Sequence, residues 1–342
     1  MAFPKINKAQ ILLTGPKRLF IGAYGFEDRS TGWAEFQGKS NNKKILTDSI
    51  LIKYEPKKGD NKIESLKKSL EKIGIHLPKE FEFNYSAIDD IEDRLAKQMK
   101  KANDFDEIIL DITALTKYLI LVILCTLRNY KGVLRVVYSE AKNYAPTAIE
   151  FEKFKINPKA ISKFPTQGFG TILRAKCLSS IRMQGQPVCL VALTSFNEML
   201  IRHMLGTISP YRLVLINGSP PRTDFKWREF ATQYIHNKLI KEYSSFNEID
   251  TRTGLLKRVA STFYYQEVFN ELEKVYNEFG MHERIIVAAT GSKMQAVGLF
   301  LFKIKHEDVH IEYPTPDSYF FKGMSVGIEE VHEIIFANFS EV

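Results

Sequence analysis

The sequence predicts an α/β protein built from two tandem parallel sheets, and three features of the chain support that prediction. A buried strand, a polar turn and an apolar helix follow one another at 107–127 and again at 284–302. Both turns contain a lysine, Lys117 and Lys293, at matching places (293 − 117 = 176). Apolar runs rich in β-branched residues alternate with helical segments along most of the chain, as central parallel strands require.

The first half alternates short strands with helices from residue 18 onward. The segment 61–74 places Ile63, Leu66, Leu70 and Ile73 on one face, which is typical of an amphipathic helix. An order of alternating strands and helices with short connections predicts a parallel, right-handed, Rossmann-like sheet. The expected strands are Arg18–Tyr24, Ile45–Tyr54, Phe81–Tyr85, Ile108–Ile112 and Gly132–Tyr138.

The second half repeats this order after a crossover. Residues 145–187 contain several prolines and glycines and show no strong period, so we expect a linker with one short helix near Ile172–Met183. A long helical region, Asp224–Phe279, interrupted near Ser244–Gly254, takes the place of the third strand and its helices. The expected strands are Val188–Leu193, Arg212–Ile216, Ile285–Ala289 and His310–Tyr313.

Landmarks in the two halves recur at nearly constant spacing, which indicates internal duplication. Phe26 and Phe196 each follow the first strand of their half (196 − 26 = 170), and Tyr138 and Tyr313 lie in the last (313 − 138 = 175). We therefore predict a first Rossmann-like domain at 1–145, a crossover linker at 146–187, and a second domain at 188–342 with a long helical insertion. The two domains are expected to form an intramolecular pseudo-dimer about an approximate two-fold axis.

Composition is that of a globular protein with an anionic partner. The 342 residues are 44% hydrophobic and 26% charged, with a formal net charge of +8. This mild excess is compatible with nucleic acid but does not by itself indicate it. The three cysteines form no CxxC pair, the N-terminus lacks an apolar signal core, and the apolar run Tyr118–Leu127 is too short to span a bilayer. We expect a cytoplasmic protein with no membrane partner.

The candidate site residues lie in the loops that follow the strands, because ligands bind outside the carboxyl ends of strands in such sheets. A strand–turn–helix unit leaves unpaired N–H groups at the positive end of a helix, which favours a phosphate. The same Ser, Thr and Gly residues also cap helices in ordinary proteins, and both interpretations stay open. The candidates are Tyr24, Phe26, Glu27, Asp28, Arg29, Thr113, Thr116 and Lys117 in the first half, and Thr194, Ser195, Phe196, Asn197, Asn217, Arg222, Thr290, Gly291, Ser292 and Lys293 in the second.

Individual residues of this set have alternative roles. Glu27 and Asp28 fit either an acid/base pair near a substrate or the negative charge that favours a helix start. Phe26 and Phe196 fit either stacking on a base or packing in the core.

Known cofactor and metal motifs are absent or misplaced. The chain has neither G-x-G-x-x-G after a strand nor G-x-x-x-x-G-K-[ST]. The stretch 306–310 matches H-E-x-x-H, but we expect His306 to end a helix and His310 to open a strand, so the two histidines do not share a helical face. We expect no cofactor and no metal.

The strand–turn–helix units resemble the signature of the CARF family, the CRISPR-associated Rossmann folds. The turn is matched as Thr290-Gly291-Ser292-Lys293-Met294, and as Thr113-Ala114-Leu115-Thr116-Lys117, which lacks both glycines. A tandem copy in one chain looks like the related SAVED arrangement. The resemblance implies a pocket for a cyclic oligoadenylate in which Lys117 and Lys293 neutralise phosphate, Thr116, Thr290 and Ser292 donate hydrogen bonds, and the loops 24–29 and 194–198 hold base or ribose.

Three functions follow as hypotheses. The first is a nucleotide second-messenger sensor of a prokaryotic antiviral defence system, which regulates a separate effector protein. The second is a ring nuclease-like phosphodiesterase that acts on a small nucleotide in the same pocket, with Glu27, Asp28 and Arg29 in chemical roles. The third is a protein-interaction scaffold whose Rossmann-like pocket is empty.

Overall fold

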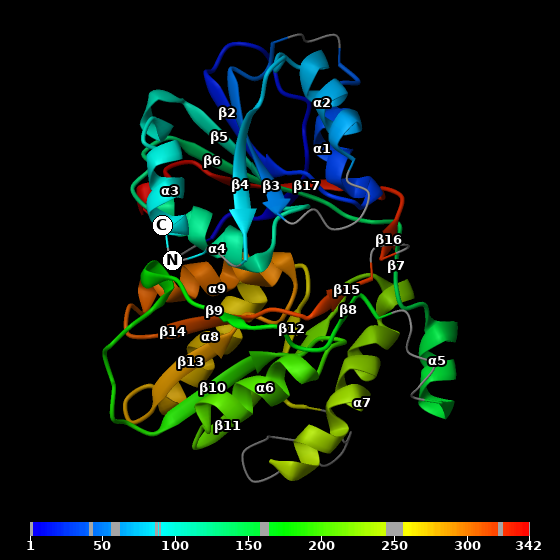
Figure 1. Ribbon diagram of the computed structural model, residues 1–342, viewed down its shortest axis with the longest axis vertical. Helices are drawn as coiled ribbons and strands as arrows, with labels where there is room; N and C mark the ends of the chain where they lie inside the picture. The colour runs from blue at the N-terminus through cyan, green and yellow to red at the C-terminus, as the bar shows by residue number, and fades with distance from the viewer. Residues whose placement is uncertain are drawn as a thin grey trace. The chain divides into compact units, whose positions relative to one another are not determined.

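The computed structural model describes residues 3–40, 44–55, 62–85, 88, 90–157, 164–243, 256–320 and 324–341. The chain divides into two compact units, Met1–Ala145 with Phe321–Val342, and Pro146–Phe320. We call these unit 1 and unit 2. Each contains one large, mostly parallel sheet covered by helices (Figure 1).

The sheet of unit 1 has the strand order β1-β17-β6-β5-β2-β3-β4. The five strands from β6 to β4 run parallel, whereas β17 is antiparallel to both of its neighbours. The strands are β1 Ile6–Lys8, β2 Arg18–Ala23, β3 Asp48–Glu55, β4 Lys79–Asn84, β5 Glu107–Asp111, β6 Val133–Ser139 and β17 Val331–Phe336. Every residue of β2 and β5 is buried, as expected of central strands covered on both faces.

In the described part of unit 1, four α-helices cover this sheet. The helices α1 Gly32–Gln37 and α2 Ile63–Lys72 pack together on one face, and α3 Ile91–Gln98 and α4 Lys117–Thr126 pack together on the other (Figure 1). The central helix α4 is apolar nearly all round, because it lies between the sheet and α3.

The sheet of unit 2 has the order β12-β11-β10-β13-β14-β9. Its first five strands run parallel, and β9 is antiparallel to β14. The strands are β9 Ile172–Leu173, β10 Val188–Leu193, β11 Arg212–Ser219, β12 Val259–Ser261, β13 Arg284–Ala288 and β14 His310–Pro314.

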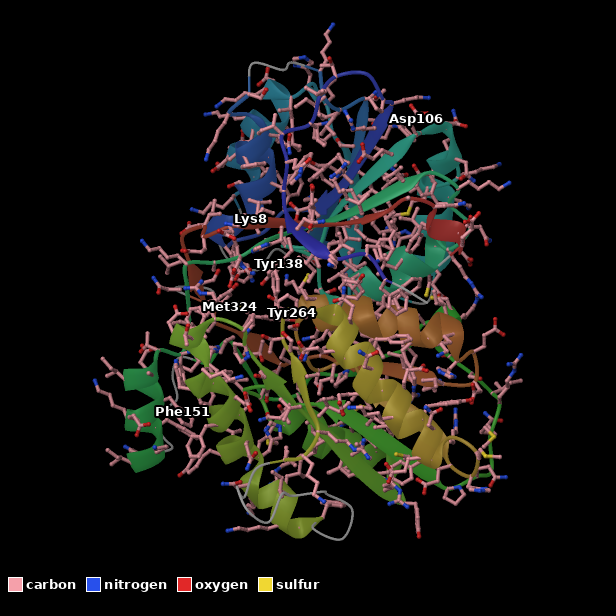
Figure 2. The ribbon with its side chains drawn as sticks, turned by 180° about the vertical axis from the view of Figure 1, so that it is seen from behind. Lys8, Asp106, Tyr138, Phe151, Tyr264 and Met324 are labelled. Atoms are coloured by element: carbon pink, nitrogen blue, oxygen red, sulfur yellow. The ribbon has the colours of Figure 1, made fainter. Side chains whose placement is uncertain are left out.

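The helices of unit 2 follow the same plan, with one addition. The helix α6 Met199–Ile208 crosses the sheet in Figure 1, and α8 Tyr265–Phe279 crosses the opposite face in Figure 2, packed along α9 Lys293–Lys305. The added helix is α5 Ala148–Ile156, which packs on α7 Trp227–Glu242. Phe151 points from α5 toward α7, where its ring lies 5.8 Å from that of Trp227 (Figure 2).

Two short strand pairs mark the places where the chain passes from one unit to the other. In unit 1, β7 Asn143–Tyr144 follows β6 and pairs with β16 Ser325–Val326, which leads into β17. In unit 2, β15 Ser318–Tyr319 follows β14 and pairs with β8 Thr166–Gln167, which leads into β9. The chain after β7 therefore completes the sheet of unit 2, and the chain after β15 completes the sheet of unit 1.

Equivalent backbone hydrogen bonds support this correspondence. Glu140 donates to the carbonyl of Glu330 (2.8 Å) and accepts from the N–H of Glu329 (2.9 Å). At equivalent positions (315 − 140 = 175), Thr315 donates to Thr171 (2.7 Å) and accepts from Gly170 (2.8 Å). The two units thus share topology and local geometry, in agreement with the predicted tandem duplication.

Three sequence expectations need correction. The region 224–279 does not replace the third strand, because β12 lies between α7 and α8; the break expected near 244–254 falls outside the described residues. The stretch 172–183 holds β9 and a 3-10 helix, Lys176–Leu178, in place of a helix, because Ile172 and Leu173 complete a sheet edge.

The third correction concerns where the domains divide. The predicted linker 146–187 contributes α5, β8 and β9 to unit 2 and is not a passive connection. The segment expected to close the second domain instead supplies β16 and β17 to unit 1, because β17 pairs with β6.

Candidate functional site

The two strand–turn–helix units place their lysines at the same helical position. Lys117 is the first residue of α4 and Lys293 the first of α9, each directly after a hydroxyl-bearing N-cap. The Thr116 hydroxyl accepts from the N–H of Leu119 (3.3 Å), and the Ser292 hydroxyl accepts from the N–H of Gln295 (3.0 Å). Both lysines are half-buried at the positive end of a helix dipole, where an anion is favoured.

The turn hydroxyls are largely engaged within the protein. Thr290 donates to the carbonyl of Leu193 (2.5 Å), and Ser292 donates to that of Thr262 (2.5 Å). Thr113 accepts from the N–H of Ser139 (2.9 Å). These contacts fit the capping interpretation of the hydroxyl residues, so the groups best suited to a phosphate are the lysines and first-turn N–H groups.

The packing around Gly291 leaves no room for a side chain at this position. A Cβ there would lie 2.8 Å from the Cδ1 of Leu193 and would also collide with the side chain of Gln295, which forms a reciprocal capping box with Ser292. The glycine is therefore required by the packing of its own turn, whether or not a ligand approaches it.

Tyr54 at the end of β3 is a further candidate that sequence reasoning missed. Its hydroxyl donates to the carbonyl of Ala114 (3.1 Å) and accepts from the N–H of Thr116 (3.0 Å), so it holds the turn of unit 1. The sequence could have indicated Tyr54 through its position near the carboxyl end of β3, the strand next to β2, where ligands bind in such sheets. Burial lowers the pKa of the neighbouring Lys117 to about 8.

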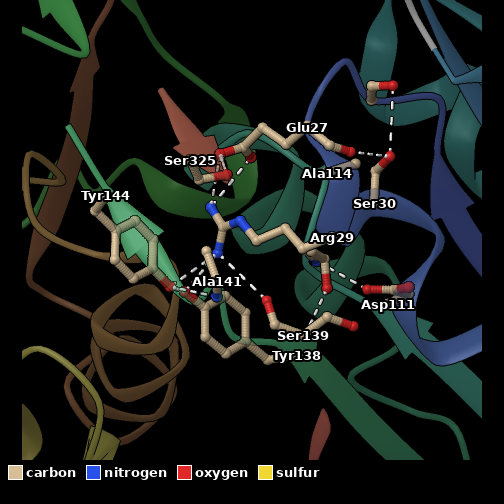
Figure 3. A network of polar contacts seen from close by, with 12 residues as sticks. Glu27, Arg29, Ser30, Asp111, Ala114, Tyr138, Ser139, Ala141, Tyr144 and Ser325 are labelled. Atoms are coloured by element: carbon tan, nitrogen blue, oxygen red, sulfur yellow. Dashed lines mark hydrogen bonds and ion pairs between the residues drawn. The ribbon is translucent and has the colours of Figure 1, made fainter. Parts of the chain in front are cut away.

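The loop after β2 contains a buried ion-pair network (Figure 3). The guanidinium of Arg29 lies 3.1 Å from the carboxylate of Glu27 and donates to the hydroxyls of Tyr138 (2.7 Å) and Tyr144 (3.4 Å). Ser325 on β16 donates to the same carboxylate (2.6 Å). The network joins the loop to β6, β7 and β16.

Asp28 and Tyr24 also have internal partners. The N–H of Gly327 (3.2 Å) and the ammonium of Lys62 (3.1 Å) hold the pKa of Asp28 below its usual value. The hydroxyl of Tyr24 donates to Glu80 (2.7 Å), and burial raises the pKa of that phenol. The contacts of Glu27, Asp28 and Arg29 match a structural role more closely than an acid/base pair.

The corresponding loops of unit 2 are held by uncharged contacts. Asn217 accepts from the hydroxyls of Thr194 (2.6 Å) and Thr232 (2.8 Å), which fixes the ends of β10 and β11 to α7. The side-chain amide of Asn197 donates to the carbonyl of Gly168 (2.9 Å). The backbone N–H of Asn197 donates to the hydroxyl of Ser195 (3.4 Å).

The remaining candidates belong to an aromatic cluster or its rim. Phe196 lies 5.5 Å from the ring of Phe164, and the guanidinium of Arg228 lies 4.5 Å from the Phe196 ring centre. Phe196 therefore packs in the protein, as its core alternative predicted. Arg222 pairs with Asp224 (2.6 Å) beside this cluster, and Phe26 in unit 1 is half-buried.

The described residues contain no group of His, Cys, Asp or Glu side chains that could hold a metal ion. His306 follows the last residue of α9 and His310 opens β14, so the H-E-x-x-H match does not form a zinc site. Among the described residues, no helix is both long enough and apolar enough to cross a membrane.

No family model matches the chain, and no curated protein matches it. Among solved structures it is similar to a type III CRISPR defence DNA nuclease activated by cyclic oligoadenylate, with a TM-score of 0.49 and 10% identity over 91% of this chain and 68% of that one. It is also similar to a universal stress protein from Archaeoglobus fulgidus, with a TM-score of 0.23 and 10% identity over 86% of this chain and 95% of that one. At this level the likenesses assign no function.

Proposed function

We propose that this chain is a sensor that binds a small phosphate-bearing nucleotide and uses Lys117 and Lys293 as phosphate contacts. The observation that carries the proposal is the equivalence of α4 and α9. Each begins at a lysine directly after a hydroxyl N-cap, at the carboxyl edge of a parallel sheet. A cation, a helix dipole and first-turn N–H groups together favour a phosphate over a neutral ligand.

The resemblance of the turn at 290–294 to the CARF signature names the ligand class, a cyclic oligoadenylate. In this proposal the protein acts in prokaryotic antiviral defence, in the cytoplasm, and the bound nucleotide changes its affinity for a separate effector protein. The loops 24–29 and 194–198 border the same sheet edges as the lysine turns and would contact base or ribose.

The phosphodiesterase alternative needs a group that is available for chemistry. Glu27 and Arg29 are buried and engage each other, Ser325 and two tyrosines, which favours binding over turnover. Incubation of the protein with a radiolabelled cyclic oligoadenylate separates the two functions, because an enzyme releases a shorter product with time and a sensor returns the ligand intact.

We expect Lys293→Ala to weaken binding of a cyclic oligoadenylate by about 1.5–3 kcal/mol, the scale of a charge-assisted hydrogen bond. Lys117→Ala should cost less, because Ala114 and Leu115 add bulk to its turn and its lowered pKa leaves part of the population uncharged near neutral pH. Titration calorimetry with the cyclic tri-, tetra- and hexa-adenylates measures both losses.

The matched control for this experiment is Lys238→Ala, which removes an exposed lysine from α7. It should bind like the wild type. Unchanged affinity of Lys293→Ala, with an intact far-ultraviolet circular dichroism spectrum, would count decisively against the site. Equal losses at Lys117 and Lys293 would show that the two turns contribute alike.

A further inference from the structure

The helix α5 carries apolar side chains on two opposite faces. Phe151 is buried against α7, with its ring 5.8 Å from that of Trp227. On the outer face, Ile149 and Ile156 are 70% and 87% exposed. They are two helical turns apart (156 − 149 = 7), so they lie one above the other. A helix that is apolar on both sides is normally covered on both sides, and in the described part of the chain nothing covers this outer face.

The exposed face belongs to a well-anchored helix. The Thr147 hydroxyl accepts from the N–H of Glu150 (3.3 Å), and the Glu150 carboxylate accepts from the N–H of Thr147 (2.9 Å), which forms a capping box. Just before the helix, the carbonyl of Pro146 accepts from the guanidinium of Arg228 on α7 (2.9 Å). Because α5 is already held in place, a partner that binds its outer face need not order it first.

The sheets do not require α5. The helix lies in the connection between β7 and β8 and packs on the outside of α7 (Figure 1). The corresponding connection, between β15 and β16, consists of residues 320–324, fewer than the nine residues of α5 alone. A much shorter link therefore suffices between the equivalent strand pairs. The helix is an addition to the surface of unit 2, and its outer face is available for a contact outside the fold.

Two charged residues border the apolar stripe of α5, one on each edge. Glu152 and Lys153 lie between the two isoleucines in the sequence, and both are exposed. Successive residues of a helix are about 100° apart, so Glu152 lies about 60° to one side of Ile149 and Lys153 about 40° to the other. Glu152 also pairs with Lys155 of its own helix (2.7 Å). One edge of the stripe is therefore negative and the other positive.

This arrangement of charges is complementary to itself. When a second copy is rotated by half a turn about an axis parallel to α5, each isoleucine meets its equivalent. Glu152 then lies opposite Lys153 of the second copy on both edges of the stripe. In an antiparallel pair each charged residue would face its own equivalent, and like charges repel. The charges therefore favour a parallel pair of helices.

We propose that the outer face of α5 is a self-association surface through which two copies of this chain pair, with their α5 helices parallel and related by a two-fold axis. The pairing needs no nucleotide and goes beyond the proposed function. A contact between two such helices, each about 14 Å long, is smaller than the roughly 1,200 Å² of a standard interface. We therefore expect a weak dimer that forms as the protein concentration rises.

Sedimentation velocity of the ligand-free chain at about 5 to 500 μM tests the proposal, and the sedimentation coefficient should rise toward that of a dimer. Ile149→Asp and Ile156→Asp should each raise the dissociation constant at least about tenfold, because each removes a buried apolar side chain from the contact. The matched control is Ile181→Asp, which changes an 81% exposed isoleucine between the 3-10 helix Lys176–Leu178 and β10. It should associate like the wild type.

Charge exchange tests the geometry of the pair. Glu152→Lys and Lys153→Glu should each weaken self-association about fivefold or more, because like charges then face each other. An equimolar mixture of the two variants should associate at least as well as the wild type, since the lysines of one chain then face the glutamates of the other. Restored association in the mixture also shows that both variants are folded.

Three results would overturn the proposal. The first is a wild type that stays monomeric over this concentration range. The second is self-association that Ile156→Asp leaves unchanged, and the third is a mixture of the charge variants that associates no better than its components. None of these results affects the nucleotide-binding test, because no ligand is present.

Discussion

Lys117 illustrates how burial at a helix start sets the behaviour of one side chain. Its pKa falls from 10.5 to about 8 because the ammonium loses water, and the turn beside it is closed by Tyr54. An amine that titrates near neutral pH makes any anion contact at this position dependent on pH, since only the protonated form attracts a phosphate.

We expect the affinity for a cyclic oligoadenylate to decrease as pH rises through about 8, by at most about tenfold for each pH unit above it. Deprotonated Lys117 must take up a proton when phosphate binds, which opposes binding at high pH. In Lys117→Arg the charge persists, so the same calorimetric titrations from pH 7 to 9.5 should show a flatter profile. Identical profiles for the two proteins would mean that Lys117 does not contact the ligand.

His236 on α7 is the second residue whose burial has a measurable effect. It is fully buried, its Nδ1 lies 2.8 Å from the carbonyl of Thr232, and burial lowers its pKa to about 4. The unfolded chain therefore binds a proton between pH 6.5 and 4 that the native protein does not bind. Stability from this residue is complete above pH 6.5 and is lost as the pH falls.

We expect the free energy of unfolding to decrease by about 1.4 kcal/mol per pH unit through this window because of His236 alone. His236→Gln keeps a hydrogen-bond donor but cannot be protonated, so its unfolding free energy should change less between pH 6.5 and 4.5. Urea unfolding followed by circular dichroism measures the difference. His76→Gln, at an exposed histidine, is the control, and an acid response in which His236→Gln equals the wild type would contradict the assignment.

Among the helices, α9 depends on a glycine for its fit against α8. A Cβ on Gly298 would collide with the backbone carbonyl of Tyr265 and with the side chain of Val268. Gly206 on α6 is also helical, but a Cβ there would meet nothing within 4 Å. The two glycines therefore differ in environment and share a secondary structure.

We expect Gly298→Ala to destabilise the protein by about 1–3 kcal/mol, because backbone must move to admit the methyl group. Gly206→Ala should instead stabilise it by about 0.5–1 kcal/mol through the higher helix propensity of alanine. Thermal unfolding of both variants shows whether each substitution lowers or raises the stability of the protein. A Gly298→Ala protein as stable as Gly206→Ala would show that α8 and α9 have room between them.

The sequence predicts elements where the local pattern is strong. The parallel strands of unit 1 and β10, β13 and β14 lie where apolar runs predicted them, and both lysine turns begin helices as expected. β1 and β17 were not predicted, because Ile6–Lys8 has no apolar run and β17 finds its place through a partner far away in the chain. The hydroxyl contacts of Thr290 and Ser292 likewise depend on the positions of Leu193 and Thr262, which spacing does not encode.

Considered as a whole molecule, the protein is two units of similar topology, of which unit 2 is one continuous stretch of chain and unit 1 is completed by the segment 321–342. β17 pairs with β6 on one side and with β1 on the other, although it follows β15 of unit 2 in the chain. Removing the covalent link between β15 and β16 leaves those pairings in place. The pairing of the two units about a two-fold axis stays a prediction.

We expect a chain cut by a protease site placed between Phe320 and Met324 to keep its C-terminal fragment under native conditions. The fragment contains β17, which has hydrogen-bonded neighbours on both edges and buries Ile334 and Phe336. Size-exclusion chromatography followed by mass spectrometry detects whether the fragment co-elutes. Phe336→Asp should release it, whereas Asn338→Asp, beyond the last residue of β17, should not. Release of the unmodified fragment would contradict the observed pairing.

The position of β17 after unit 2 in the chain also has a consequence for the order in which the two units can fold during synthesis. The strand β1 emerges first, yet its only described sheet neighbour is β17, which is synthesised after the whole of unit 2. Until then β6 presents an unpaired edge, which is a template for wrong partners. Unit 2 receives β8 and β9 before its own parallel strands and can close as soon as β14 is made. Unit 2 can therefore finish folding before unit 1, although most of unit 1 is translated earlier. Unit 1 is completed only when β17 has been synthesised.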